Sequence, residues 1–301
     1  MKSQTAGNWA LLTALTLMWG TAFVFIKIAV AAVPPLTLVA SRMLLAAVIL
    51  GAWAWWSRRR ARPAVAPDTT PRPRWGACVA LAVLGNCIPF FLIAWGQQTI
   101  DASLTSILIA VMPLGVIVLA HFFVAGDRLT AARAAGFATG FAGVVLLIGP
   151  SALAGLGGAL HEVAAQVAIV GAALCFAGNA VLARRSVAVQ DALAVSAIVI
   201  AIGAALTLPL ALALERPWTL APGAGPLAAL VWIGIGPTAI ATVLYFRLIA
   251  RAGPAFMSLV NYATPVIGLA VGTSALGERP ELTAYLGLAL ILCGIAVSRR
   301  T

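Results

Sequence analysis

The chain has 301 residues, of which 62% are apolar and only 9% are charged, and its mean hydropathy is +1.06. A soluble domain carries about 25% charged residues, so this composition excludes a soluble enzyme, a secreted disulfide scaffold and a disordered tail. The net charge of +11 would suggest nucleic acid on a soluble protein. Here arginine-rich loops on the cytoplasmic side explain it, and no nucleic-acid partner is expected.

Apolar stretches long enough to cross a membrane recur along the whole chain. A helix needs about 20 such residues to cross the hydrocarbon core, and the sequence predicts ten spans. They lie at about 9–29, 36–56, 75–95, 103–123, 132–150, 164–184, 193–213, 226–246, 254–274 and 282–298. The predicted fold class is an all-α polytopic membrane protein with ten transmembrane helices. The first stretch is too long for the apolar core of a signal peptide.

The distribution of lysine and arginine predicts the orientation in the membrane. With the N-terminus in the cytoplasm, 15 of the 19 basic residues fall in cytoplasmic segments, above all in the Arg-rich loop 57–74. The outer loops hold only Arg216 and Arg279, while Lys27 and Arg42 lie within spans, near the outer ends. This bias predicts a multi-pass protein of a bacterial-type inner (plasma) membrane with both termini in the cytoplasm.

Two segments, Leu84–Leu147 and Ile235–Ser298, resemble each other. The matched positions are Ser106 with Ser258, Pro113 with Pro265 and, after one single-residue gap, Gly126-Asp127-Arg128 with Gly277-Glu278-Arg279. The two halves are then residues 1–150 and 151–301, with five spans each. Because five is odd, the second half enters the membrane from the opposite side. Such inverted repeats occur in transporters that alternate access around a central site. An old duplication without transport is the alternative.

The charged and thiol side chains argue against several kinds of chemistry. All eight acidic residues lie in loops or at span ends, which disfavours a carboxylate at the membrane centre as the coupling group. The four cysteines fall inside apolar runs without a CxxC pair, and the two histidines are far apart. We therefore expect no metal site, no cofactor and no disulfide framework. The sequence also has no cluster of nucleophilic residues that would suggest an enzyme.

Polar and aromatic side chains within the spans are the candidates for binding a small molecule. Ser258, Asn261, Tyr262 and Pro265 are spaced i, i+3, i+4 and i+7, which places them on one helical face. Asn261 can either bind substrate or hydrogen-bond a neighbouring helix. The predicted substrate-binding residues are Trp19, Phe23, Asn86, Phe176, Asn179, Tyr245, Ser258, Asn261 and Tyr262. Such aromatic walls with amide and hydroxyl groups are typical of small-molecule sites.

Four further residues within spans have two interpretations each. Arg42 and Lys27 can contact an anionic group that enters from outside, or extend to the lipid headgroups. The pseudo-symmetric match of Lys27 with Arg184 favours headgroups for Lys27, whereas Arg42 has no such counterpart. Pro113 and Pro265 are predicted hinges at equivalent depth, with a static kink as the alternative.

The stretches "MWGTAFVFIKIAV", "PPLTLVASRMLLAAVIL" and "GERPELTAYLGLALILCG", with the ten-span two-half plan, resemble the EamA family of the drug/metabolite transporter superfamily. The resemblance covers nearly the whole chain. It implies ten helices in inverted repeats, with termini inside, and export of amino acids and other metabolites. It also assigns Asp127 and Glu278 to a Gly-Asp/Glu signature at a helix boundary, for which we expect helix capping or loop bracing.

The sequence thus predicts a transporter that exports or facilitates movement of small metabolites, amino acids first among them, by alternating access around a central cavity. Spans 1, 3, 4, 6, 8 and 9 would line this cavity. The partners would be a small-molecule substrate and membrane lipid. The alternative is an exporter of drugs or other neutral lipophilic compounds.

Overall fold

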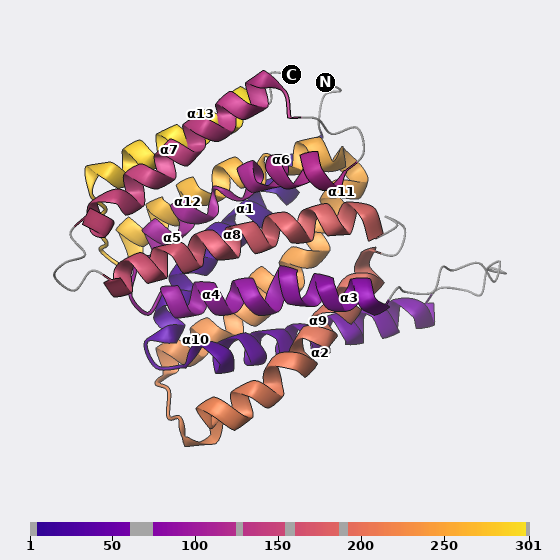
Figure 1. Ribbon diagram of the computed structural model, residues 1–301. Helices are drawn as coiled ribbons and strands as arrows, with labels where there is room; N and C mark the ends of the chain where they lie inside the picture. The colour runs from indigo at the N-terminus through magenta and orange to yellow at the C-terminus, as the bar shows by residue number, and fades with distance from the viewer. Residues whose placement is uncertain (1–4, 61–74, 125–128, 154–159, 187–191, 299–301) are drawn as a thin grey trace.

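The computed structural model describes residues 5–60, 75–124, 129–153, 160–186 and 192–298, and every element in these ranges is helical (Figure 1). The elements are α1 (Ala6–Val30), α2 (Pro35–Arg60), α3 (Trp75–Ala82), η1 (Val83–Cys87), α4 (Ile88–Gly96), α5 (Ala102–Ile109), α6 (Met112–Phe123), α7 (Ala131–Leu153), α8 (Leu160–Ser186), α9 (Ala192–Glu215), η4 (Pro217–Thr219), α10 (Ala224–Ile233), η5 (Gly234–Ile240), α11 (Ala241–Met257), α12 (Val260–Ala275) and α13 (Leu282–Ser298). The elements η1 and η5 are π-helical turns, and η4 is a 3₁₀ turn.

Eight helical stretches in the described ranges are long and apolar enough to cross a membrane. They correspond to the first eight predicted spans. The last two predicted spans, 254–274 and 282–298, correspond to α12 and α13, which have 16 and 17 residues. The structure therefore confirms an all-helical polytopic membrane protein, while the number of ten spans remains a prediction. Most of the loop 57–74 lies outside the described residues.

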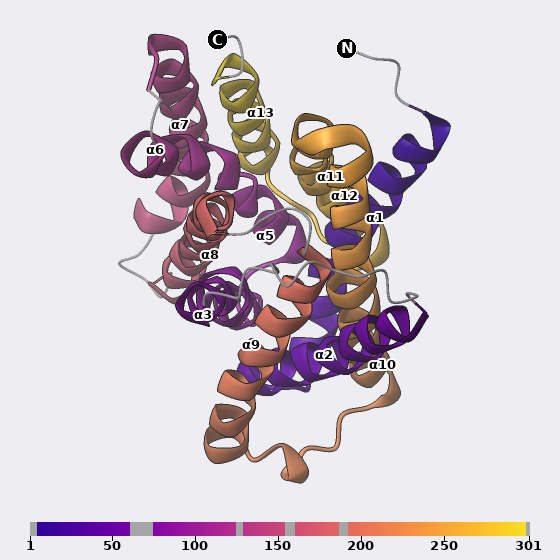
Figure 2. The same ribbon diagram turned by 90° about the vertical axis from the view of Figure 1, so that its right-hand side faces the viewer.

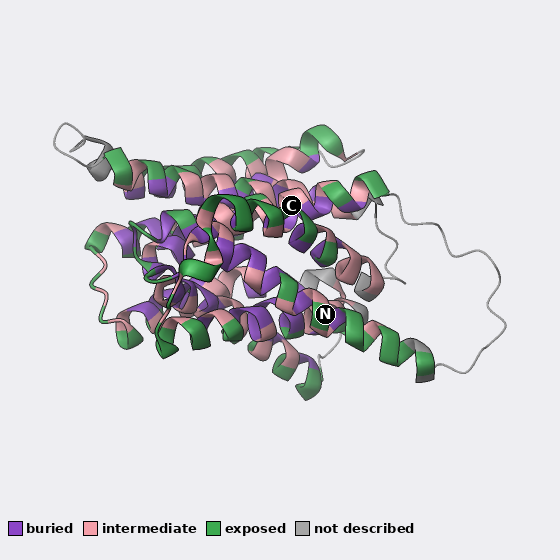
Figure 3. Cartoon of the chain, turned by 90° about the horizontal axis from the view of Figure 1, so that it is seen from below, coloured by how far each residue is buried: buried purple, intermediate pink, exposed green. Residues whose placement is uncertain are grey.

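Many large apolar side chains remain exposed, and Figure 3 shows exposed residues in green along the outward faces of the helices. Leu17, Val48, Phe141 and Leu206 are each more than 40% exposed. A soluble protein rarely leaves so much apolar surface in contact with water, whereas lipid is a suitable solvent for it. The outward faces are thus built to contact hydrocarbon.

The helices pack in three groups. Helices α7 and α13 pack along each other at one edge, and α2 packs along α9 at the opposite edge (Figures 1 and 2). Between the edges, α1 contacts α12 as well as α10 and α11, and α8 contacts α5 and α6 as well as α4. The predicted spans 1, 3, 4, 6, 8 and 9 therefore form the middle of the molecule.

The predicted hinge prolines lie in different backbone settings. Pro113 stands at the start of α6, directly after a tight turn at Ala110 and Val111 that separates α5 from α6. Pro265 lies inside the continuous helix α12, and its carbonyl accepts a 3.3 Å hydrogen bond from Ser106 Oγ. The two halves thus differ at this point, and only Pro113 sits at an interruption of its helix.

Helices α7 and α13 are held together by glycines. A Cβ atom added to Gly136 would lie 2.4 Å from the carbonyl oxygen of Gly294, and one added to Gly143 would lie 2.8 Å from that of Gly287. Only a residue without a side chain permits such contact between backbones. Gly136, Gly140 and Gly143 therefore form a face of α7 for close helix packing.

Replacing Gly294 by valine should separate α13 from α7, because a Cβ there would lie 2.4 Å from the Gly136 carbonyl oxygen. We expect the free energy of unfolding to fall by about 1–3 kcal/mol, as for overpacked interiors. Thermal unfolding of the purified protein in detergent measures this. The control is Gly149→Val on α7, where nothing lies within 4 Å of an added Cβ. Equal stability of the two variants would contradict the close packing.

Candidate substrate site

Two π-helical turns lie at corresponding points of the two matched sequence segments. Residues 83–87 form η1 and residues 234–240 form η5, so both Leu84 and Ile235, where the matched segments begin, lie in such a turn. The spacing is 151 residues between Leu84 and Ile235 and 152 residues between Ser106 and Ser258, so Asn86 of η1 corresponds to Pro237 or Thr238 of η5. Because π-helical turns interrupt the regular hydrogen bonding of a helix and occur often at functional sites, these turns are the first candidates for the site.

Arg42 of α2 lies against η5 and α4. Its side chain is buried, with 4% exposure, and its Nε and Nη2 donate to Thr238 Oγ1 at 3.2 and 2.9 Å. The guanidinium carbon lies 3.9 Å from the centre of the Phe90 ring, a distance at which a cation is attracted to an aromatic face. Phe90 in turn meets Phe176 of α8 edge to face, with ring centres 6.1 Å apart.

Trp19 of α1 contacts the same π-helical turn from the other side. Its Nε1 donates to the carbonyl oxygen of Pro237 at 3.3 Å, and its ring centre lies 5.9 Å from that of Tyr245. Arg42 and Trp19 thus both bind η5, at adjacent residues, from helices of the first half.

Asn179 of α8 lies against the other π-helical turn. A Cβ atom added to Gly85 of η1 would lie 2.6 Å from Asn179 Oδ1. A side chain of α8 therefore contacts η1 as a side chain of α1 contacts η5. Asn86 follows Gly85 in the same turn and is half-buried.

The other predicted residues are placed differently. Phe23 is buried in the main apolar core of the protein. Ser258 lies between α11 and α12, where its carbonyl accepts from the backbone N–H of Asn261 at 3.2 Å. Tyr262 packs against the main core. The structure therefore brings Trp19 to Tyr245, Phe176 to Phe90 and Asn179 to η1, while Ser258, Asn261 and Tyr262 lie around a tightened turn at the start of α12.

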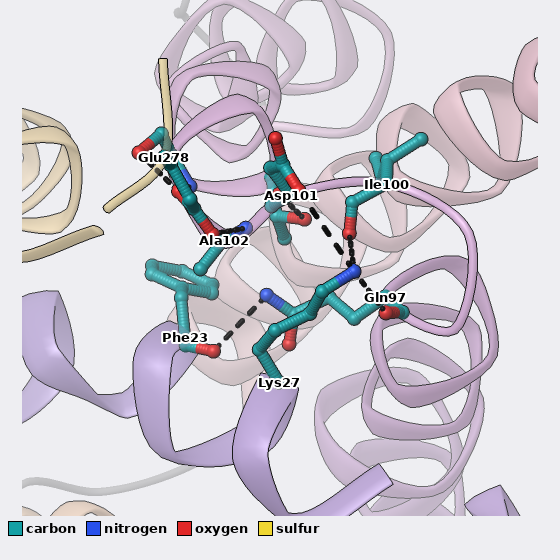
Figure 4. Close-up of polar contacts among 9 residues, drawn as sticks. Phe23, Lys27, Gln97, Ile100, Asp101, Ala102 and Glu278 are labelled. Atoms are coloured by element: carbon teal, nitrogen blue, oxygen red, sulfur yellow. Dashed lines mark hydrogen bonds and ion pairs between the residues drawn. The ribbon is translucent and has the colours of Figure 1, made fainter. Parts of the chain in front are cut away.

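A second polar cluster joins the end of α1 to the connection between α4 and α5 (Figure 4). Lys27 Nζ donates to the carbonyl oxygens of Gln97 and Ile100 at 3.0 and 2.8 Å and lies 4.0 Å from Asp101 Oδ1. Gln97 Nε2 donates to the carbonyl oxygen of Phe23 at 3.1 Å. A cavity of about 350 Å³ opens beside Lys27 and Gln97. Lys27 therefore binds backbone carbonyls at the end of α4 and in the connection to α5, and its contact with lipid headgroups stays a prediction.

Two carboxylates from residues 151–301 cap helices of residues 1–150. Glu278 accepts hydrogen bonds from the backbone N–H groups of Ala102 and Ser103, both at 2.9 Å, at the start of α5. Glu215 accepts from those of Leu36 and Thr37, at 2.9 and 2.6 Å, at the start of α2. The expected capping role of Glu278 is thus confirmed, although the helix that it caps is distant in sequence. Asp127 lies outside the described residues.

Asp101, in the polar cluster around Lys27, is influenced by charges of both signs. Partial burial raises the pKa of its carboxyl group, the negative charge of Glu278 raises it further, and Lys27 opposes both effects. The side chain is 57% exposed, so solvent screens these interactions. The ion pair with Lys27 therefore contributes less than the two hydrogen bonds from Lys27 to backbone carbonyls.

Sequence reasoning did not select four residues that the structure places at these contacts: Thr238, Pro237, Gln97 and Phe90. Thr238 and Pro237 lie in the stretch GIGPT, where glycine and proline inside an apolar run indicate an irregular helix. Gln97 is a polar residue at the end of an apolar span. Phe90 was visible as an aromatic of span 3, but nothing in the sequence indicated that Arg42 lies over it.

The fold and these contacts define a class of protein: a multi-pass helical membrane protein whose polar and aromatic side chains gather between its middle helices. The sequence pattern of the EamA-like transporter family matches this chain at residues 7–149 and again at 164–300. The chain belongs to the EamA-like transporter family and is a membrane transporter.

Known proteins of similar sequence cover nearly its whole length. A probable terminal-alkyne amino-acid exporter of Streptantibioticus cattleyicolor is 31% identical over 97% of this chain and 93% of its own. An uncharacterized transporter of Archaeoglobus fulgidus is 26% identical over 95% of each chain. The uncharacterized inner membrane transporter YedA of Escherichia coli is 24% identical over 95% of this chain and 88% of its own. A solved crystal structure, 24% identical, has a TM-score of 0.63 and covers 98% of this chain and 97% of that chain. It shares the fold.

The cap that Glu278 forms on α5 should stabilise the protein measurably. Glu278→Gln keeps the shape of the side chain but removes its charge, so the hydrogen bonds from Ala102 and Ser103 weaken. We expect the free energy of unfolding to fall by about 1–2 kcal/mol, seen as a lower midpoint of thermal unfolding in detergent. Glu281→Gln, at an exposed residue of the same connection, is the control. A midpoint unchanged in Glu278→Gln would show that the cap is dispensable.

Proposed function

We propose that this protein exports small metabolites, amino acids first among them, or facilitates their movement, across the inner membrane by alternating access. One observation carries the proposal. Arg42 and Trp19, which belong to the first half, both donate hydrogen bonds to the π-helical turn η5 of the second half. Polar contacts between the halves at an irregular part of a helix can be made and broken without unfolding a regular helix. The similarity to a probable amino-acid exporter supports the substrate class.

The proposed architecture is ten spans in two inverted halves, residues 1–150 and 151–301, with both termini in the cytoplasm. The packing supports it, because α1 contacts α12 and α10–α11 as α8 contacts α5–α6 and α4. The two matches to the family pattern, at 7–149 and 164–300, agree with the division. During alternating access, the cavity between the two halves would open first to one side of the membrane and then to the other.

The proposed substrate site lies between the halves beside η1 and η5. The aromatic residues Trp19, Phe176 and Tyr245 would contact the side chain of an amino acid, and the amides of Asn86 and Asn179 its polar end. Ser258, Asn261 and Tyr262 would contribute from the start of α12, and Phe23 from the core side of α1. Pro113 and Pro265 remain the proposed hinges. We expect Pro113 to be the more mobile hinge, because the helical backbone is interrupted directly before it.

The alternative, an exporter of neutral lipophilic compounds, is favoured by one observation. The contacts around η5 are rich in aromatic rings, including Phe90, Phe176, Trp19 and Tyr245, and such walls bind apolar compounds as well. Resistance of cells to toxic amino-acid analogues, compared with resistance to lipophilic dyes, separates the two functions.

Purified protein in liposomes should take up labelled amino acids in a saturable manner, tested with an aromatic and aliphatic panel. Because the described acids lie at helix ends, we expect uptake without a pH gradient. Empty liposomes are the control. Uptake only with a gradient would refute facilitated movement and direct attention to the acids at the outer ends. Absence of uptake under both conditions would leave the lipophilic alternative.

Trp19→Phe should lower the rate of uptake by roughly 2- to 10-fold, the value of one hydrogen bond. Phenylalanine keeps an aromatic ring beside Tyr245 but cannot donate to the Pro237 carbonyl oxygen. Trp218→Phe is the matched control, because Trp218 is 69% exposed in η4. Equal rates for both variants, at equal amounts of folded protein, would remove Trp19 from the site.

A further inference from the structure

Arg42 is a buried cation for which the described part of the chain supplies no carboxylate. Its side chain is 4% exposed, and its polar contacts are those with the neutral hydroxyl of Thr238 and the ring of Phe90. Buried charges are normally paired, since removing an ion from water costs much free energy. In membrane proteins an ionisable residue within a span commonly marks a functional site.

The acidic residues of the described ranges are placed where they do not neutralise Arg42. Glu215 and Glu278 are occupied by backbone N–H groups at the starts of α2 and α5. Asp101 lies beside Lys27, and Glu281 is exposed. Glu162 lies in the first turn of α8 and is within hydrogen-bond distance of Gln166. Within the described ranges, the positive charge of Arg42 is therefore left for a group that these residues do not provide.

The geometry of the Arg42 guanidinium indicates which chemical group would neutralise its charge. Arginine has five N–H donors, and Thr238 Oγ1 occupies the edge formed by Nε and Nη2. The edge formed by Nη1 and Nη2 has no partner among the described residues. This edge is a planar fork that matches the two oxygens of a carboxylate. Phe90 lies 3.9 Å from the guanidinium carbon, over one face of the group, so a ligand would approach in its plane.

The position of Arg42 fits a transported ligand. It lies seven residues after Pro35, or about 10 Å along the axis of α2, and it joins α4 of the first half to η5 of the second. A carboxylate that bound the free edge would contact both halves through one side chain. Release of the ligand would be needed before the halves separate around it.

We propose that Arg42 is the carboxylate-binding group of the transport site, so that the transported solutes are small carboxylates. The proposal rests on the proposed function, and it deepens that function by excluding neutral lipophilic compounds as the main substrates. The chemistry is a two-point, charge-assisted hydrogen bond between the guanidinium edge and the carboxylate. The aromatic contacts at Phe90 and Phe176 lie beside this bond and would receive the side chain of the solute.

The test compares three compounds of similar shape: L-phenylalanine, its amide L-phenylalaninamide, and 3-phenylpropanoate. Binding is measured as the shift in thermal unfolding of the purified wild-type protein, and transport as uptake into liposomes. We expect both carboxylates to bind and the amide to bind roughly 10- to 100-fold more weakly, because it offers no charge to Arg42. Equal binding of the acid and its amide would overturn the proposal.

Variants separate ligand binding from a structural role. In Arg42→Gln the preference for acid over amide should disappear, and in Arg42→Lys it should persist at reduced size, since lysine keeps the charge but not the fork. Arg216→Gln removes one exposed arginine and should keep the full preference. If Arg42→Gln does not fold, Arg42→Lys provides the second variant, because it keeps the buried charge. A preference of full size in Arg42→Lys would contradict binding of the carboxylate by the guanidinium fork.

The possible outcomes distinguish failure of the proposed role of Arg42 from failure of the proposed amino-acid transport. Transport of amino acids and their amides at equal rates would refute the role of Arg42 and leave an amino-acid transporter. Arg42-dependent transport of 3-phenylpropanoate alone would uphold the role of Arg42 and refute amino acids as substrates. Transport of neutral dyes alone would refute both. A lower unfolding temperature of Arg42→Gln with an unchanged acid preference would show that Arg42 only holds α2 to η5.

Discussion

A polar group placed in apolar surroundings has to find its partner within the protein, and this constraint determines where the helices of this chain meet. The N–H groups at the starts of α2 and α5 are bound by Glu215 and Glu278, and the carbonyl groups at the end of α4 are bound by Lys27. Each of these partners is a charged side chain from a distant part of the chain. These three charges therefore connect helix ends to other segments through charge-assisted hydrogen bonds.

Both carboxylate caps connect residues 151–301 to residues 1–150. Their four hydrogen bonds to backbone N–H groups join the C-terminal end of α9 to α2 and the connection before α13 to α5. On the predicted orientation all of these ends face outside, so the halves are held together there. Movement of one half against the other has to preserve or exchange these bonds, because an uncapped helix start leaves several N–H groups without a partner. The caps would thus link the stability of the protein to the proposed alternating-access motion.

The sequence predicted what depends on composition and spacing, and it failed where the partner of a side chain depends on tertiary contact. The eight apolar spans follow from local patterns, and the family resemblance indicated a capping role for Glu278, but the helix that Glu278 caps could not be read from the sequence. The partner of Lys27 does not follow from local patterns, because its position near a span end suits both headgroups and a neighbouring helix end. Likewise the match of Pro113 with Pro265 is visible in the sequence, but the different backbones around them result from packing. Thr238 escaped notice because a single hydroxyl in an apolar helix usually bonds to its own backbone, as Thr238 also does with Ile233.

Arg42 differs from Lys27, Glu215 and Glu278 because its contacts within the protein do not account for its charge. Lys27, Glu215 and Glu278 each satisfy several backbone groups, so the structure accounts for their charges. The hydrogen bonds of Arg42 are to one hydroxyl that is already engaged with the Ile233 carbonyl oxygen, and a neutral side chain such as glutamine could bond that hydroxyl without the cost of a buried cation. A structural role alone therefore explains the contact but not the charge. The proposed negatively charged ligand explains both, because it would neutralise the cation only while it is bound between the two proposed halves.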